Sequence, residues 1–160
     1  MILVIIVVVL GSAPIGCCGA GGAAESPEAA PAPAESATCD LKVVVESFRS
    51  TNGTLRLALF NSPKGFPNSG DAALATRDEA VTASTMTVDF SDLPYGEYAI
   101  VLYHDENGND MMDKNFLGMP KEGYGASGYA SVFFSEPEFE KAEFFLRSES
   151  VTIRIPLHYW

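Results

Sequence analysis

Residues 54–60 read TLRLALF, and residues 150–159 read SVTIRIPLHY. In both stretches large apolar side chains alternate with polar or small ones, which is the two-residue period of a β-strand with one buried face. Residues 41–48, LKVVVESF, begin with the same alternation. The side chains expected to face the core from the two earlier strands are Leu41, Val43, Val45, Leu55, Leu57 and Leu59.

The rest of the chain predicts further strands and no amphipathic helix of useful length. Four more strands are predicted over residues 81–90, 98–104, 129–134 and 142–147. A long loop with several Pro and Gly residues is expected between residues 61 and 80. Seven strands without helices predict an all-β fold, a seven-stranded antiparallel β-sandwich. Pro156 predicts that the last strand lies at a sheet edge.

The charge balance argues against nucleic acid as a partner. The 160 residues carry 10 Lys and Arg against 21 Asp and Glu, a formal net charge of −11. Phosphate binding depends on clustered basic residues, which this composition does not supply. Two histidines and three cysteines also leave little for a zinc site or a catalytic centre built from those residues.

The beginning of the sequence predicts export. Residues 1–10, MILVIIVVVL, form an apolar run of about half the roughly 20 residues that a membrane-spanning helix needs. Residues 1–18 are therefore interpreted as a secretory signal peptide. Gly16 before Cys17 is typical of a lipoprotein signal with lipidation at Cys17, although Pro14 is unusual there. Plain cleavage and a soluble secreted product are the alternative.

A flexible linker is predicted after the leader. Residues 19–38 are rich in Ala, Gly, Pro, Glu and Ser and hold no large apolar side chain, so they cannot offset the entropy cost of ordering. The folded domain is expected over residues 39–160. The expected location is periplasmic, outer-membrane-anchored or secreted, with membrane contact only through the lipid.

One loop carries a chemical signal, namely a possible calcium site. Calcium takes six to eight oxygen ligands, and alternate residues of a tight loop can direct short side chains at one point. The predicted ligands are the side chains of Asp105, Asn107, Asn109 and Asp113 and the carbonyl of Met111. Asp110 and Glu122 are possible additional ligands. The alternative is a polar turn with no ion, because Asn107-Gly108 is itself a strong turn signal.

Other residues near this loop are candidates for binding or catalysis. His104 beside Asp105 suggests a catalytic pair. The alternative is that His104 is a structural histidine held by hydrogen bonds. Residues 118–128 are glycine-rich but lack the Gly-Lys-Ser/Thr ending of a phosphate loop. Tyr124 and Tyr129, in and after this segment, are the predicted contacts for a ligand or a protein partner.

Several motifs together resemble a known family. They are Tyr103–Asn109 (YHDENGN), Asn115–Gly118 (NFLG), Pro120–Gly125 (PKEGYG), Leu57–Phe60 (LALF), Gly65–Pro67 (GFP), Leu93–Tyr98 (LPYGEY) and the closing strand Val151–Leu157. Over residues 40–160 the chain resembles the uncharacterised bacterial family DUF2141. The resemblance implies a small exported domain with an immunoglobulin- or transthyretin-like sandwich and no assigned biochemical function. Asp110 stands where the family pattern has Gly, and residues 126–128 also depart from it.

The function expected from the sequence is a non-enzymatic, exported or envelope-associated module. It would be stabilised by calcium in the 105–113 loop and would bind an unidentified protein or small ligand through the adjacent loops. One alternative is a small hydrolase using His104 and Asp105, such as a transthyretin-related ureide hydrolase, although that activity relies on more histidines than this chain has. Another alternative is a purely structural interaction domain.

Overall fold

The computed structural model describes residues 37–129 and 135–160, which fall within one compact unit, Glu35–Trp160. The predicted signal peptide, Cys17, the linker as far as residue 36 and most of the predicted strand 129–134 lie outside the described residues. The elements are β1 (Thr38–Glu46), β2 (Thr54–Phe60), η1 (Gly70–Ala72), β3 (Ala75–Ala80), β4 (Thr85–Pro94), β5 (Gly96–Asp105), β6 (Gly123–Ala126), α1 (Phe139–Ala142), β7 (Phe144–Leu146) and β8 (Ser150–Pro156).

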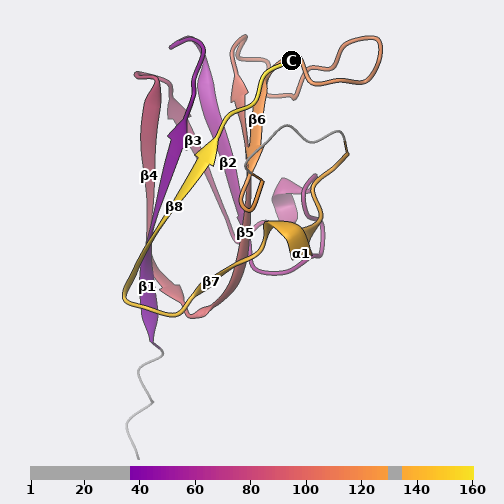
Figure 1. Ribbon diagram of the computed structural model, residues 1–160. Helices are drawn as coiled ribbons and strands as arrows, with labels where there is room; N and C mark the ends of the chain where they lie inside the picture. Colours follow the sequence, from indigo (N-terminus) through magenta and orange to yellow (C-terminus); the bar gives the residue numbers. More distant parts are fainter. Residues whose placement is uncertain (1–36, 130–134) are drawn as a thin grey trace, which may run out of the picture. The chain divides into compact units, whose positions relative to one another are not determined.

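The strands form two sheets (Figure 1). One sheet has three strands in the order β4-β1-β8, and the other has the order β3-β2-β5-β6 with β7 paired to the start of β5. Neighbouring strands run antiparallel except β1 and β8, which are parallel. Because β8 lies at an edge of its sheet, the prediction from Pro156 is confirmed.

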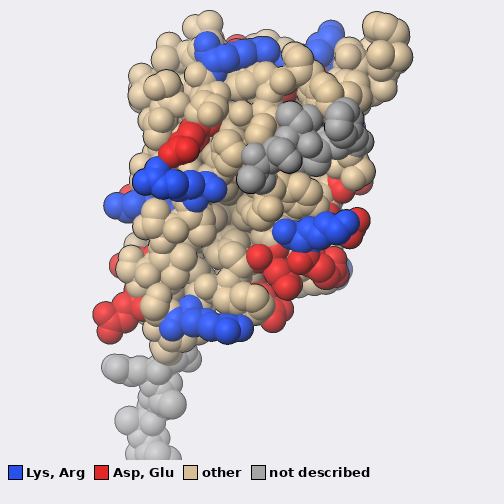
Figure 2. Space-filling model, viewed as in Figure 1, with Lys and Arg blue, Asp and Glu red and all other residues tan. Residues whose placement is uncertain are grey.

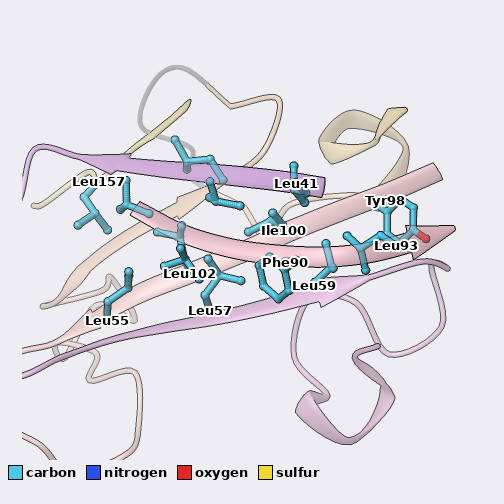
Figure 3. Packing of buried hydrophobic residues seen from close by; sticks show 14 of the residues in the cluster. Leu41, Leu55, Leu57, Leu59, Phe90, Leu93, Tyr98, Ile100, Leu102 and Leu157 are labelled. Atoms are coloured by element: carbon cyan, nitrogen blue, oxygen red, sulfur yellow. The ribbon is translucent and has the colours of Figure 1, made fainter. Parts of the chain in front are cut away.

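The main hydrophobic core contains side chains of both sheets (Figure 3). Leu41 of β1 lies in the same cluster as Leu57 of β2 and Ile100 of β5, and each is at most 3% exposed. All six side chains predicted to face the core are buried there. Cys39 is a free thiol in the same cluster. The alternating apolar residues of β1 and β2 therefore face the core, as their two-residue period predicts.

A second, smaller cluster covers part of the other face of the larger sheet. Phe60 and Ala99 pack there with Phe139 and Ala142 of α1. The ring of Phe66, from the loop after β2, meets the rings of Phe60 and Phe139 edge to face, with centroids 5.2 Å and 5.6 Å away. The outer face is thus closed by apolar packing at the end of β2, whereas Arg56 lies near its beginning.

The all-β class and the predominantly antiparallel pairing are confirmed, and the strand count is corrected from seven to eight among the described residues. Two strands were not predicted. β3 falls in the expected long loop, because its sequence ATRDEA is exposed along nearly its whole length and has no apolar face. β6, GYGA, falls in the expected glycine-rich crossover.

Three connections meet at one end of the domain, which is opposite to the end where Thr38 begins β1 (Figure 1). They are residues 47–53, residues 106–122 and the last residues of the chain. Arg49 forms an ion pair with Glu106, and the amide of Arg49 donates to the Tyr159 hydroxyl at 3.4 Å. We refer to this end of the domain as the loop end.

Gly53 is fixed by both its backbone and its surroundings. Its φ is +80°, and an added Cβ would overlap the carbonyl oxygen of Asp105. Gly53→Ala is therefore expected to lower the free energy of unfolding by more than about 3 kcal/mol in a denaturant titration.

Gly118 is the matched control, because it has the same φ of +80° and nothing within 4 Å of an added Cβ. Gly118→Ala should cost only about 1 kcal/mol, the penalty of the left-handed backbone alone. Equal losses in the two variants would show that the contact between residues 53 and 105 does not constrain the loop end.

Candidate functional site

Asp105 ends β5, and its buried carboxylate organises the loop that follows. The residue has no exposed surface. Its Oδ1 accepts hydrogen bonds from the amides of Gly108 at 2.7 Å and Asn109 at 3.2 Å, and its Oδ2 accepts one from the amide of Asp110 at 3.0 Å. Three consecutive amides therefore turn the chain around one side chain.

Arg56 supplies the positive charge next to this carboxylate. Its Nε lies 3.3 Å from Oδ2 of Asp105, and its two terminal nitrogens pair with Asp78 and Asp110. Burial alone would raise the pKa of Asp105, but the three amides and Arg56 outweigh it and hold that pKa below its ordinary value. Asp105 is thus a paired, ionised group inside the fold.

Asp110 has a backbone conformation that favours glycine. Its φ is +64°, in the left-handed region that glycine adopts without strain. Here an aspartate adopts that conformation and pairs with Arg56 at the sheet surface. The aspartate therefore adds a contact between the loop and the sheet that a glycine would not make.

The side-chain oxygens of the predicted calcium ligands take part in hydrogen bonds within the loop. The side-chain oxygens of Asn107 and Asn109 accept from the amides of Asn109 and Met111, at 3.0 Å and 2.9 Å. Asn107 Nδ2 donates to Asp113 at 2.7 Å. Within residues 37–129 and 135–160, no three His, Cys, Asp or Glu side chains are placed to hold a metal. Calcium binding stays a prediction.

Glu122 contacts this loop at Asp113, and one of its two carboxylate oxygens has no hydrogen-bond partner. The residue is 4% exposed; its Oε2 accepts from the Asp113 amide at 3.3 Å, and its Oε1 has no hydrogen-bond partner. Burial raises the pKa of Glu122, the charges of Asp105 and Asp113 add to the rise, and the backbone amides of Asp113 and Glu106 oppose it. From the sequence, Glu122 is only a possible additional ligand. Its burial could not be predicted, because nothing in the local sequence pattern indicates it.

His104 lies on the opposite face of β5 from Asp105, since successive side chains of a strand alternate. It is fully buried, with Nε2 2.6 Å from the carbonyl of Asn52 and Nδ1 2.8 Å from the hydroxyl of Tyr159. A carbonyl can only accept, so Nε2 carries the proton and Nδ1 accepts from the hydroxyl. In this arrangement His104 links residues 47–53 to the chain's last residues.

A groove lies on the outer face of the larger sheet, beside the loop. Asp78, Arg56, Tyr103 and Tyr124 are in register across β3, β2, β5 and β6, and all four line it. The groove has a volume of about 760 Å³. Ala58 and Val101 form the next row of its floor.

Apolar side chains from two further segments form part of the groove wall. Met111, Met112 and Met119 come from the loop after β5, and Trp160 comes from the end of the chain. Trp160 Nε1 donates to the Tyr124 hydroxyl at 3.0 Å. Of the two predicted ligand contacts, Tyr124 lies in this groove, whereas Tyr129 packs beside the second hydrophobic cluster and its hydroxyl accepts from the Glu138 amide at 3.2 Å.

The role of His104 can be measured as stability. His104→Ala would leave the Asn52 carbonyl and the Tyr159 hydroxyl without their buried partner and would open a cavity, so we expect a loss of about 2–4 kcal/mol in the free energy of unfolding. Tyr159→Phe, which removes one hydrogen bond, should cost about 1 kcal/mol. A His104→Ala protein as stable as the wild type would contradict the linking role.

The comparisons with known proteins give one match. The model of a family described as an uncharacterized protein conserved in bacteria, DUF2141, matches residues 43–154, which is more than half of the chain. No curated protein matches the chain, and no solved structure matches it. The resemblance predicted from the sequence motifs is therefore confirmed, and the chain belongs to the DUF2141 family.

Proposed function

We propose that the protein is a non-enzymatic binding module whose site is the groove on the outer face of the larger sheet. The observation that carries this proposal is the lining: three of the chain's five methionines lie there with Tyr103, Tyr124 and the single tryptophan. Methionine and aromatic side chains are adaptable apolar contacts that are common in binding sites. A volume of about 760 Å³ is in the ordinary range for a small-molecule pocket.

The lining favours a ligand with an apolar body and a polar end. The methionines and Tyr103 offer apolar area, while Arg56, Asp78 and Lys114 contribute charges of both signs to the lining. A small amphipathic molecule and a short segment of a partner protein both fit this chemistry. The groove is open rather than enclosed by the described residues, which suits either kind of ligand.

A hydrolase using His104 and Asp105 is the competing proposal. The two side chains lie on opposite faces of β5, and both ring nitrogens of His104 are engaged inside the protein. A catalytic base needs to reach a substrate proton. This geometry favours the binding module over the hydrolase; a purely structural interaction domain is the third possibility.

We also propose that the sandwich is of immunoglobulin- or transthyretin-like type.

We further propose that the protein is exported, with a signal peptide over residues 1–18 and lipidation at Cys17. The support for export is the short apolar run before Gly16-Cys17. Among the described residues no helix is long and apolar enough to cross a membrane. The mass of the mature N-terminus tests this, because an unmodified terminus beyond Cys18 would contradict lipidation.

The groove can be tested with anilinonaphthalene sulfonate, a fluorescent dye with an apolar body and one charge. We expect the dye to bind the folded protein and to change the emission of Trp160, which lines the groove. Met112→Ser combined with Met119→Ser should weaken binding about tenfold or more, because two apolar contacts are lost.

Phe145→Ser is the matched control, since Phe145 is 41% exposed on β7 and lies outside the groove. It should leave dye affinity unchanged. A wild-type protein that binds no dye, or equal affinities in all three proteins, would contradict the proposed site.

A structural calcium ion is a second candidate function, favoured by one observation. The Oε1 atom of Glu122 is buried without a hydrogen-bond partner, while Oε2 accepts from the amide of Asp113, whose side chain accepts from Asn107. A buried carboxylate oxygen of this kind is costly unless a proton or a cation satisfies it. Calcium prefers carboxylate and amide oxygens, so Glu122, Asp113 and Asn107 are the side chains that would contact it.

The calcium proposal predicts a thermal response. Calcium at about 100 times its dissociation constant would stabilise the fold by about 2.7 kcal/mol and raise the melting temperature of chelator-treated protein by several degrees. Magnesium should do less, because it demands a tighter octahedral shell. Glu122→Gln should abolish the response and should stabilise the metal-free protein, because it removes a buried charge.

Glu79→Gln provides the control on the exposed strand β3, where calcium should act as on the wild type. A melting temperature indifferent to millimolar calcium would leave residues 105–113 as a loop held by Asp105 and Arg56 alone.

A further inference from the structure

The loop between β5 and β6 contains a small projecting hairpin, residues 111–121, which we call the finger (Figure 1). Lys114 and Pro120 form an isolated antiparallel bridge across it. The amide of Lys121 donates to the Asp113 carbonyl at 2.8 Å, which closes its base. The finger is therefore a defined turn at the loop end.

The side chain of Asn115 holds the tip. Its Oδ1 accepts from the amides of Leu117 at 2.9 Å and Met119 at 3.0 Å, and its carbonyl accepts from the Gly118 amide at 2.9 Å. Gly118 completes the turn with a φ of +80°. These bonds fix the backbone without burying the apolar side chains that it carries.

Two large apolar side chains at the tip lie in the open. Phe116 is 94% exposed and Leu117 is 71% exposed, and Met111 at the base is 63% exposed. No other large apolar side chain among the described residues reaches the exposure of any of these three. Exposed apolar groups gathered on one projection mark an interaction site more strongly than single ones scattered over a surface.

The exposed charges of the finger are all positive, which is unusual on this protein. Lys114 and Lys121 are exposed, while the single acid of the segment, Asp113, is half-buried and accepts a hydrogen bond from Asn107. The whole chain has a net charge of −11. In Figure 2 the projection at the upper right is tan, whereas the largest red group of this face lies lower, near α1.

We propose that the finger docks the protein onto a lipid surface that carries anionic headgroups. Phe116 and Leu117 would enter the interface between headgroups and acyl chains, and Lys114 and Lys121 would lie against the lipid phosphates. The charge complementarity is local: the rest of the acidic domain is repelled by such a surface, so the contact is confined to the finger. This contact is additional to any lipid attached at Cys17.

The geometry favours lipid over a protein partner. The tip is convex and touches almost nothing, so a protein would need a pocket deep enough to enclose two large side chains. A fluid interface accepts a projection without a matching pocket, and partitioning of apolar side chains with flanking lysines is the ordinary way in which surface segments bind membranes. Phe116 and Leu117 at the tip are absent from the groove lining, whereas Met111 and Lys114 belong to it, so the tip variant tests lipid contact separately from the groove.

Flotation with vesicles tests the proposal, using residues 35–160. This fragment is suitable because every described strand and both hydrophobic clusters lie within the unit Glu35–Trp160, and because the apolar run at residues 1–10 would itself enter lipid. Vesicles of phosphatidylcholine with about three-tenths phosphatidylglycerol should bind the wild type, and raised salt should weaken binding.

Phe116→Ser combined with Leu117→Ser should weaken vesicle binding at least about tenfold with no change in melting temperature, because both side chains are exposed. Lys114→Gln with Lys121→Gln should cost about tenfold on anionic vesicles and little on pure phosphatidylcholine. Leu74→Ser and Lys64→Gln are the matched controls, at exposed positions in the loop after β2, and should bind as the wild type does.

Absence of wild-type binding, or binding that is equal in the tip variant and the controls, would overturn the proposal. Sedimentation of the same proteins distinguishes a protein interface. A concentration-dependent dimer that the two serines abolish, without vesicle binding by the wild type, would assign the tip to a second copy of the chain instead.

Discussion

A buried carboxylate at the end of β5 is the constraint on which the loop end depends. Asp105 is fully buried, and an ionised group in that position is tolerated only when hydrogen bonds and an opposite charge compensate it. The amides of residues 108–110 and the guanidinium of Arg56 provide both. The need to compensate the Asp105 charge therefore determines the path of the chain after β5. It also explains why Arg56 lies next to β5 on the neighbouring strand β2.

The two faces of the larger sheet have different roles: the inner face packs in the main core and the outer face carries the groove. On the outer face, the cluster around Phe60 covers one end. The row that contains Arg56 and Tyr103 is not covered by α1 and lines the groove. The loop that Asp105 organises leads into the finger, whose base forms one wall of that groove and whose tip lies outside the lining. His104, on the inner face, ties residues 47–53 to the end of the chain. One strand, β5, therefore positions the groove, the finger and the base of the loop end.

The sequence predicts the parts of this structure that depend on local periodicity. β2 was predicted with the bounds it has, because its alternation is strict, whereas β3 was missed because it is exposed on both faces. The spacing of residues 105–113 predicted oxygen side chains in a tight loop, and these oxygens accept hydrogen bonds within it. It could not indicate that backbone amides would occupy them, nor that the compensating charge would come from Arg56, which is 49 residues away in the chain. Burial of Glu122 and exposure of Phe116 likewise depend on tertiary packing.

Amide hydrogen exchange in the presence of a chelator reports directly whether Asp105 holds the loop. If the Asp105 carboxylate holds the loop, the amides of Gly108, Asn109 and Asp110 are protected in the metal-free wild type. In Asp105→Ala they should exchange about tenfold or more faster, while the amides shared between β2 and β5 stay protected. Rapid exchange of the three loop amides in the wild type, or protection unchanged in the variant, would show that the Asp105 carboxylate does not hold the loop.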